Sequence, residues 1–263
     1  MNAIAPADTV GRIVAESPQL SRVFEELQID YCCGGKRPLE DVCRERQIDV
    51  GQLVDRLEKA SAARASVPGE SWLSAPLWEL CEHIERTHHD YLQRELPRLH
   101  AIIEKVVKAH GENHPELLQV QAAFAELRAE LEPHMMKEEC ILFPSIRYLE
   151  ANGKPMRFPF GSLANPIHVM VSDHDHAGDA LARIRELTCN YVPPKGACNT
   201  YRVMLEGLST LEHDMHQHVH KENNILFPRA VELEAKIGTP GEAPAVACGC
   251  GHSSPRVHLP LLA

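Results

Sequence analysis

One phrase occurs twice in this chain and limits the folds that the chain can adopt. HMMKEECILFP begins at His134 and HVHKENNILFP begins at His218, so both copies join His-x-x-x-Glu to Ile-Leu-Phe-Pro. Residues four apart lie on the same face of an α-helix. Each copy therefore predicts a helix that presents an imidazole and a carboxylate side by side, from His134 with Glu138 and from His218 with Glu222.

Both pairs lie on apolar helix faces. Apolar residues at helical spacing continue the two faces, namely Leu127, Leu131, Ile141 and Leu142 in the first copy and Leu208, Leu211, Met215, Ile225 and Leu226 in the second. Ionisable groups on such faces would point into a core, where an uncompensated charge costs several kcal/mol. A bound cation would compensate them.

The repeat extends to two further helices. The spacing from His89 in HHD to His174 in DHDH matches, to within a single position, the spacing from His134 to His218 in the paired motifs. Two helix hairpins thus share one design, in which the first helix offers one histidine and the second offers a histidine and a glutamate. The apolar pattern of its helix fits His88 at least as well as His89, so the pattern leaves that choice open.

Other histidines near these motifs are not expected to bind metal. On the third helix, the apolar stripe favours His174 over His176. His216 and His220 form a further pair four residues apart, but register with the first copy selects the histidine between them. We expect both to face solvent.

The predicted donor set indicates the kind of metal. Four imidazoles and two carboxylates without a thiolate disfavour a structural zinc site and suit non-haem iron or manganese. If both carboxylates bridge two irons, a solvent-derived oxo or hydroxo bridge completes five ligands and leaves one position open on each iron. A diferrous pair then carries +4 − 2 = +2, which favours anionic or readily reduced diatomic ligands. We predict two non-haem irons per chain, oxo- or hydroxo-bridged.

Helical periodicity dominates the chain, and strand signals are scarce, with 5% aromatic residues. An all-α fold is expected, built on an up-down-up-down four-helix bundle. Its long helices are predicted at residues 75–109, 115–150, 166–189 and 198–236. Pro97, Pro133 and Pro144 lie inside these spans and predict kinks or breaks.

The predicted organisation has four parts, at residues 1–65, 66–74, 75–236 and 237–263. The first is a small domain of short helices, in which Ser17 is a candidate N-cap and Pro18 the first helical residue. A linker and the bundle follow. The last part is expected to be a flexible tail, in which the thiols of CGCGH are more plausibly incidental than a soft-metal motif.

Composition excludes several kinds of partner. With 37 acidic and 27 basic residues the formal net charge is −10, which disfavours binding to nucleic acid or to an anionic membrane surface. The N-terminal residues do not resemble a secretion signal, and nine cysteines form an odd number. A reducing cytoplasm is therefore the expected location. Outside the CCGG segment, we expect small core or surface residues at Cys43, Cys81, Cys140, Cys189 and Cys198.

The segment DYCCGGK places Cys32 and Cys33 beside two glycines that let the backbone bend sharply. Adjacent thiols can form only a strained disulfide, which suits redox or transfer chemistry better than a structural crosslink. Two small, half-buried residues in a tight turn would show the same pattern. The residues alone do not separate these readings.

DYCCGGKRPLEDVC and the two phrases together resemble the iron–sulfur cluster repair proteins, the family called repair of iron centres, over about residues 8–236. The resemblance implies a hemerythrin-like di-iron bundle behind a small helical domain, in a cytoplasmic protein of the nitrosative and oxidative stress response. It implies functional roles for Cys32 and Cys33, and it selects His89 over His88. The implied ligands, with both glutamates bridging, are His89, His134, Glu138, His174, His218 and Glu222.

These features predict repair of damaged iron–sulfur proteins, by iron donation or by removal of nitrosyl ligands, with Cys32 and Cys33 assisting the passage of iron. An alternative is a module that binds or senses diatomic gases, with O2 or NO as its ligand. A third is a di-iron nitric oxide reductase, so enzymatic turnover is left open. The client, the electron donor and the oligomeric state are not predicted, a homodimer being one option.

Overall fold

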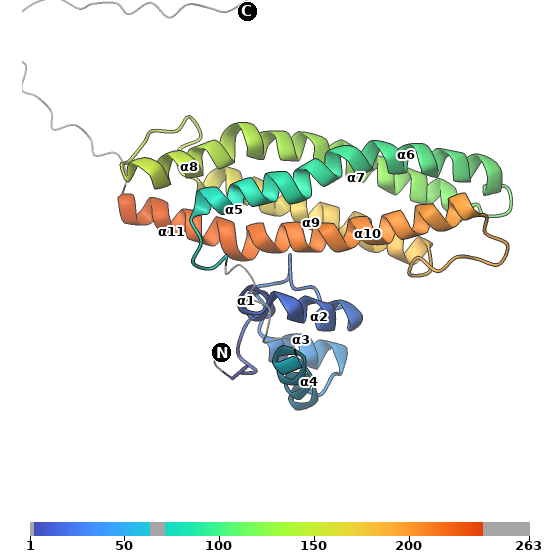
Figure 1. Cartoon of the computed structure of the whole chain (residues 1–263), viewed down its shortest axis with the longest axis horizontal. Helices are drawn as coiled ribbons and strands as arrows, with labels where there is room; N and C mark the ends of the chain where they lie inside the picture. The colour runs from blue at the N-terminus through green and yellow to red at the C-terminus, as the bar shows by residue number, and fades with distance from the viewer. Residues whose placement is uncertain (1–2, 64–71, 239–263) are drawn as a thin grey trace, which may run out of the picture.

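The computed structural model describes residues 3–63 and 72–238, and every regular element in those ranges is helical (Figure 1). Four long helical rods lie side by side, with short connections that reverse the chain direction. The predicted all-α bundle is confirmed, and the rods begin and end within two residues of the predicted spans. The rods are α5 (Leu77–Ile84) with α6 (Asp90–His110), α7 (Glu116–Lys137) with α8 (Phe143–Asn152), α9 (Ala164–Leu187), and α10 (Asn199–Lys221) with α11 (Phe227–Ile237).

Three of the rods contain a π-helical turn where their two named helices meet. These turns span Glu85–His89, Glu138–Leu142 and Glu222–Leu226. A π turn accommodates an extra residue within a helix and is frequent at functional sites. Here each turn begins or ends at a predicted metal ligand.

Kinks or breaks were predicted at the prolines, and a break is wrong at two of them, because α6 continues through Pro97 and α7 continues through Pro133. Pro144 stands in the first turn of α8, where its missing backbone N–H costs little. The π turns also alter the predicted core stripe. Ile141 is 46% exposed, whereas its counterpart Ile225 is buried because α1 packs against the second copy of the turn.

The N-terminal part contains α1 (Val10–Glu16), α2 (Ser21–Glu26), α3 (Leu39–Arg46) and α4 (Val50–Ala63). A short 3-10 turn begins at Pro18 and leads into α2, as the Ser-Pro signal predicted. These helices surround a core of their own, which includes Val10, Val14, Leu20, Phe24, Leu39 and Leu57. The N-terminal part therefore has an apolar interior separate from that of the bundle.

The bundle has two apolar clusters, one on each side of its polar centre. One includes Leu92, Leu96, Phe124, Leu181 and Leu208. The other includes Leu80, Ile84, Phe143, Ile146 and Phe227. The residues between these clusters in each rod are the predicted metal ligands. Within the described ranges, no helix combines the length and the apolar content that crossing a membrane requires. The predicted tail and most of the linker lie outside the described residues.

The N-terminal helices dock beside α10 (Figure 1), and one asparagine makes a central contact between the two parts. The amide of Asn224 donates hydrogen bonds to the carbonyl oxygens of Tyr31 and Cys32, at 3.3 and 3.0 Å. Gly11 and Gly35 face the same side chain, and a Cβ at either position would overlap it. Cys32 itself packs into a core cluster of the bundle, so the docked loop contributes directly to the interior of the bundle.

Candidate metal centre

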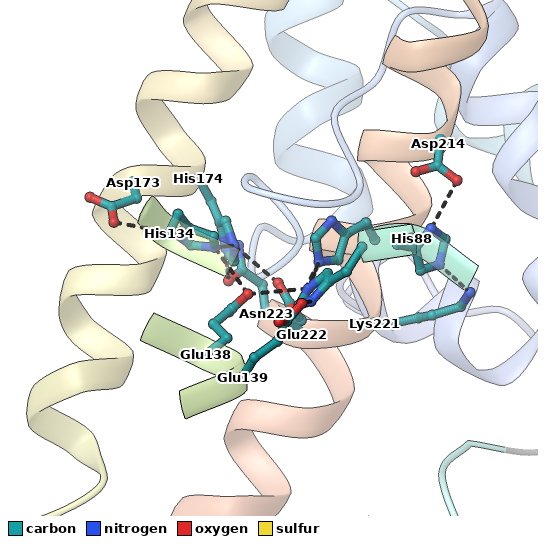
Figure 2. A network of polar contacts seen from close by, with 12 residues as sticks. His88, His134, Glu138, Glu139, Asp173, His174, Asp214, Lys221, Glu222 and Asn223 are labelled. Carbon is teal, nitrogen blue, oxygen red and sulfur yellow. Dashed lines mark hydrogen bonds and ion pairs between the residues drawn. The ribbon is translucent and has the colours of Figure 1, made fainter. Parts of the chain in front are cut away.

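The structure brings all six predicted ligands together. Figure 2 labels four of them, His134, Glu138, His174 and Glu222. Each side chain is at most 1% exposed. The ligand atoms form two groups of four, and within each group they lie within 4.8 Å of one another. One group is His89, Glu138, His218 and Glu222, and the other is His134, Glu138, His174 and Glu222. Both glutamates thus belong to both groups.

The distances show how the glutamates join the two groups. Glu138 Oε2 lies 3.3 Å from Nε2 of His134 and 3.4 Å from Nε2 of His89. Glu222 places Oε1 3.1 Å from Nε2 of His218 and Oε2 3.0 Å from Nε2 of His174. Each carboxylate therefore reaches one imidazole of each group, which is the arrangement that a pair of bridging carboxylates requires.

The nitrogen and oxygen atoms in this cluster are arranged to bind a metal rather than to hydrogen-bond with one another. Among the described residues, neither carboxylate oxygen of fully buried Glu138 has a hydrogen-bond partner. The Nε2 atoms of the imidazoles face each other in pairs, at 3.2 Å for His89 with His218 and at 3.1 Å for His134 with His174. Nitrogen and oxygen lone pairs that converge in a dry core are a suitable environment for a cation.

The electrostatics of the cluster agree with this reading. Burial acts to lower the pKa of His134, but the charges of Glu138 and Glu222 outweigh burial and raise that pKa to about 9. The pKa of His89 is raised in the same way, against burial. Burial acts to raise the pKa of both glutamates, yet the imidazoles lower it. The metal-free cluster therefore holds protons that a cation would displace on binding.

Three of the imidazoles are held from behind by an acceptor (Figure 2). The Nδ1 atoms of His89, His134 and His174 lie 2.9, 3.2 and 2.9 Å from side-chain oxygens of Glu139, Asp173 and Asn223, respectively. An acceptor at Nδ1 places the proton on that nitrogen and turns the Nε2 lone pair toward the cluster, which orients a metal ligand and raises its basicity. The sequence analysis did not single out these three residues, although each is adjacent to a predicted ligand.

The phenylalanine of each repeated phrase also contacts the site. Phe143 stacks on His89, with ring centroids 5.8 Å apart, and Phe227 stacks on His174 at 6.0 Å. The phrase Ile-Leu-Phe-Pro thus recurs because each copy places an aromatic ring against the imidazole offered by the other helix of its hairpin. Repetition of the phrase beyond the glutamate was the available signal for this role.

His88 is buried beside the cluster without belonging to either group. Its Nδ1 lies 2.9 Å from Asp214 Oδ1, its Nε2 lies 2.7 Å from Lys221 Nζ, and its ring stacks parallel to that of His218. Burial lowers the pKa of His88 to about 4. The apolar pattern could not distinguish His88 from His89 as the ligand because both side chains are buried.

The expectation that His220 faces solvent is wrong. His220 is 3% exposed, because the N-terminal loop covers this side of α10, and its Nδ1 lies 3.3 Å from the carbonyl oxygen of Tyr31. His216 is partly buried and contacts the ring of Tyr31 edge-on. Packing between parts of the chain that are distant in sequence accounts for both.

The structure places the two adjacent cysteines next to the metal cluster and outside it. The carboxylate of Asp30 accepts hydrogen bonds from the backbone amides of Cys32 and Cys33, at 2.9 and 3.0 Å. Cys33 Sγ lies 3.6 Å from the carbonyl oxygen of His174. The contact with Cys33 and burial raise the pKa of Cys32, which keeps this thiol protonated at neutral pH.

A cavity of about 600 Å³ lies between this loop and helices α9 and α10. Both cysteines line it, together with the carboxylates of Asp30, Asp175 and Asp179. The half-buried Cys33 therefore faces a partly acidic space beside the turn that carries His174, whereas Cys32 borders the same space but is only 6% exposed.

A four-helix bundle whose core holds two histidine groups joined by shared glutamates defines a hemerythrin-like metal-binding protein. Residues 82–230 match the family described as hemerythrin HHE cation binding domain, and residues 6–61 match ScdA_N, a domain of unknown function. The chain belongs to the family of iron–sulfur cluster repair proteins that combine these two regions. The resemblance seen in the sequence is confirmed.

The sequence similarity to other proteins covers most of the chain. The iron-sulfur cluster repair protein YtfE of Musicola paradisiaca is 36% identical over 227 residues, which cover 86% of this chain and 97% of that protein. The proteins of the same name from Pectobacterium carotovorum and Yersinia pseudotuberculosis are also 36% identical, over 230 and 228 residues, with the same coverage.

Proposed function

We propose that the chain holds two non-haem irons and repairs iron–sulfur clusters damaged by nitrosative or oxidative stress. The observation that carries the proposal is the sharing of Glu138 and Glu222 between two histidine groups, because it provides two adjacent metal positions of the same donor type. The names of the similar proteins, which extend over both regions of the chain, support cluster repair as the task.

The donor set supports a repair role that uses iron as cargo. Imidazole and carboxylate hold ferrous iron less tightly than the thiolates of an iron–sulfur protein do. Iron can therefore pass from the bundle toward cysteine sulfur on a damaged client. Removal of nitrosyl ligands from the client is the other route by which the same centre would restore a cluster.

Cys32 and Cys33 are the groups that we propose to assist this passage. They line the cavity together with several carboxylates, which attract cations. Cys33 also touches the backbone of His174, a proposed ligand.

Metal content provides the first test. Protein purified anaerobically from iron-replete cells should contain close to two irons per chain, and a Glu138→Ala/Glu222→Ala variant should lose both. His176→Ala, at an exposed histidine on the same helix as His174, is the matched control and should retain both. A single zinc, or iron that the double variant retains, would contradict the proposed centre.

A cluster-restoration assay tests the cysteines separately. The Cys32→Ser/Cys33→Ser variant should keep its iron and restore a nitric oxide-damaged cluster more slowly than the natural chain. Restoration at the natural rate would remove the thiols from the mechanism.

A second function, binding or sensing of a diatomic gas, is favoured by the surroundings of the cluster. Phe143 and Phe227 close off the imidazoles, and the ligands are buried, so only small molecules would reach the metals. Reversible binding of nitric oxide without loss of iron during cluster restoration would favour this function over donation.

A further inference from the structure

The two halves of the metal cluster are related position by position. The spacing that takes His134 to His218 also takes Lys137 to Lys221, and a spacing one position longer takes His89 to His174. The contacts follow the same rule. Glu139 accepts from Nδ1 of His89, and its counterpart Asn223 accepts from Nδ1 of His174, each at 2.9 Å.

Two of these contacts differ between the halves. At the first, a carboxylate (Glu139) and an amide (Asn223) both accept from a histidine, so the acceptor is kept. At the second, the acceptor itself is missing from one half. Asp173, immediately before His174, lies 3.2 Å from Nδ1 of His134 and also 3.5 Å from Lys137 Nζ. The equivalent position in the other half, immediately before His89, holds His88, which lies 2.7 Å from Nζ of the counterpart lysine, Lys221. The lysine contact is thus kept, while a histidine stands where the other half has a carboxylate.

This difference removes the support of one ligand. The ring of His88 stacks on that of His218 with an angle of 3° between their planes, so the in-plane nitrogen atoms of His88 cannot accept a hydrogen bond from His218. Both nitrogens of His88 are already engaged, by Asp214 and Lys221. Among the described residues, Nδ1 of His218 is buried without a hydrogen-bond partner.

From this asymmetry we infer that the two metals are held unequally, and that the one bound by His89 and His218 is the labile metal that leaves first. An acceptor behind a histidine ligand orients the ring and raises its basicity, and loss of such a partner typically lowers metal affinity by about 10- to 100-fold. His134 has this support and His218 does not. Within the proposed repair function, on which the inference rests, the His89–His218 position supplies the exchangeable iron.

The test is the release of iron to a ferrous chelator under anaerobic conditions. The natural chain, loaded with two irons, should lose them in two phases of one iron each, with rate constants separated by about 10- to 100-fold. Release of both irons in one phase would overturn the inference. This measurement uses the unaltered protein and does not depend on how a variant folds.

Reciprocal variants assign the phases to the two positions. His88→Asp places a carboxylate beside His218, as Asp173 stands beside His134, and should slow the fast phase only. His88→Asn is a second variant, which adds an acceptor without charge. Asp173→His removes the carboxylate beside His134, so that this ligand resembles His218, and should accelerate the slow phase only. An effect of His88→Asp on the slow phase, or of Asp173→His on the fast phase, would refute the assignment. Thermal unfolding of the metal-free variants checks that each one folds.

Failure of the proposed function would be recognised separately. Two well-separated release phases in a protein that restores no cluster would uphold the unequal metals and refute the repair function. Restoration of a cluster by a protein whose irons leave in one phase would support the repair function and refute the unequal metals.

Discussion

Replacing Gly11 by alanine should loosen the docking of the N-terminal helices on the bundle. A Cβ at this position would lie 2.7 Å from Asn224 Cγ and 2.9 Å from the carbonyl oxygen of Gly35. The asparagine side chain would have to move away from the carbonyl oxygens of Tyr31 and Cys32, to which it donates. The substitution therefore acts through a side chain that lies near the other end of the sequence.

The size of the effect follows from these contacts. Two lost hydrogen bonds cost about 1 kcal/mol each, and the overlap adds about 1–3 kcal/mol of packing strain. Alanine in place of glycine within α1 returns about 0.5–1 kcal/mol. The docked arrangement should thus lose about 2–4.5 kcal/mol, which corresponds to a roughly 30- to 1,600-fold larger undocked population.

Alkylation of Cys32 under native conditions provides the assay. This thiol is 6% exposed and packs in the bundle core, so it should react mainly when the loop leaves the bundle. Gly11→Ala should raise its alkylation rate by the factor given above. In an Asn224→Ala background the overlap with asparagine is gone and the hydrogen bonds are already lost, so the same substitution should accelerate alkylation clearly less, through the remaining contact with the carbonyl oxygen of Gly35 alone. An equal acceleration in both backgrounds would refute this account of the docking.

Two further predictions concern other parts of the bundle. The backbone amide of Tyr201 and the imidazole of His110, 3.2 Å away, lower the pKa of the exposed Cys198 thiol to about 7. Its alkylation should therefore rise as the pH passes upward through about 7, and His110→Ala should move this midpoint to higher pH, as site-resolved mass spectrometry of a pH series would show. Glu212→Ala should cost about 2 kcal/mol in urea unfolding, less than the roughly 3–5 kcal/mol of a fully buried pair, because it leaves the partly buried guanidinium of Arg185 without its two-pronged partner. An unchanged midpoint or an unchanged unfolding free energy would contradict the respective prediction.

Local spacing made the bundle and the clustering of the six proposed ligands predictable. His134 with Glu138 and His218 with Glu222 are four residues apart on apolar faces, and this relation within one helix is visible in the sequence. The nearly equal offsets between the copies then pointed to the two remaining helices. The choice between His88 and His89 needed the family resemblance, because both side chains are buried and a periodicity of apolar residues cannot say which of them meets the metal.

Contacts between distant segments were not predictable in the same way. Asp173 supports His134 from another helix, and the N-terminal loop buries His220, so neither role follows from spacing. Ile141 lies outside the expected core stripe, whereas Ile225, at the same place in the other π turn, is buried because α1 covers it. Pro133 was expected to kink or break the helix, yet α7 continues through it.

The distribution of the ligands along the chain has a consequence for how the protein matures. The six side chains lie between positions 89 and 222, on four different rods, and no single helix carries more than two of them. With these six side chains as the proposed ligands, an unfolded or partly synthesised chain would have no complete site, and metal would be loaded only after the rods have assembled. Once bound, metal ties all four rods together and stabilises the folded state in proportion to the logarithm of its free concentration. The lifetime of the protein in a cell should then follow the supply of metal, so that starvation for metal would deplete the chain itself.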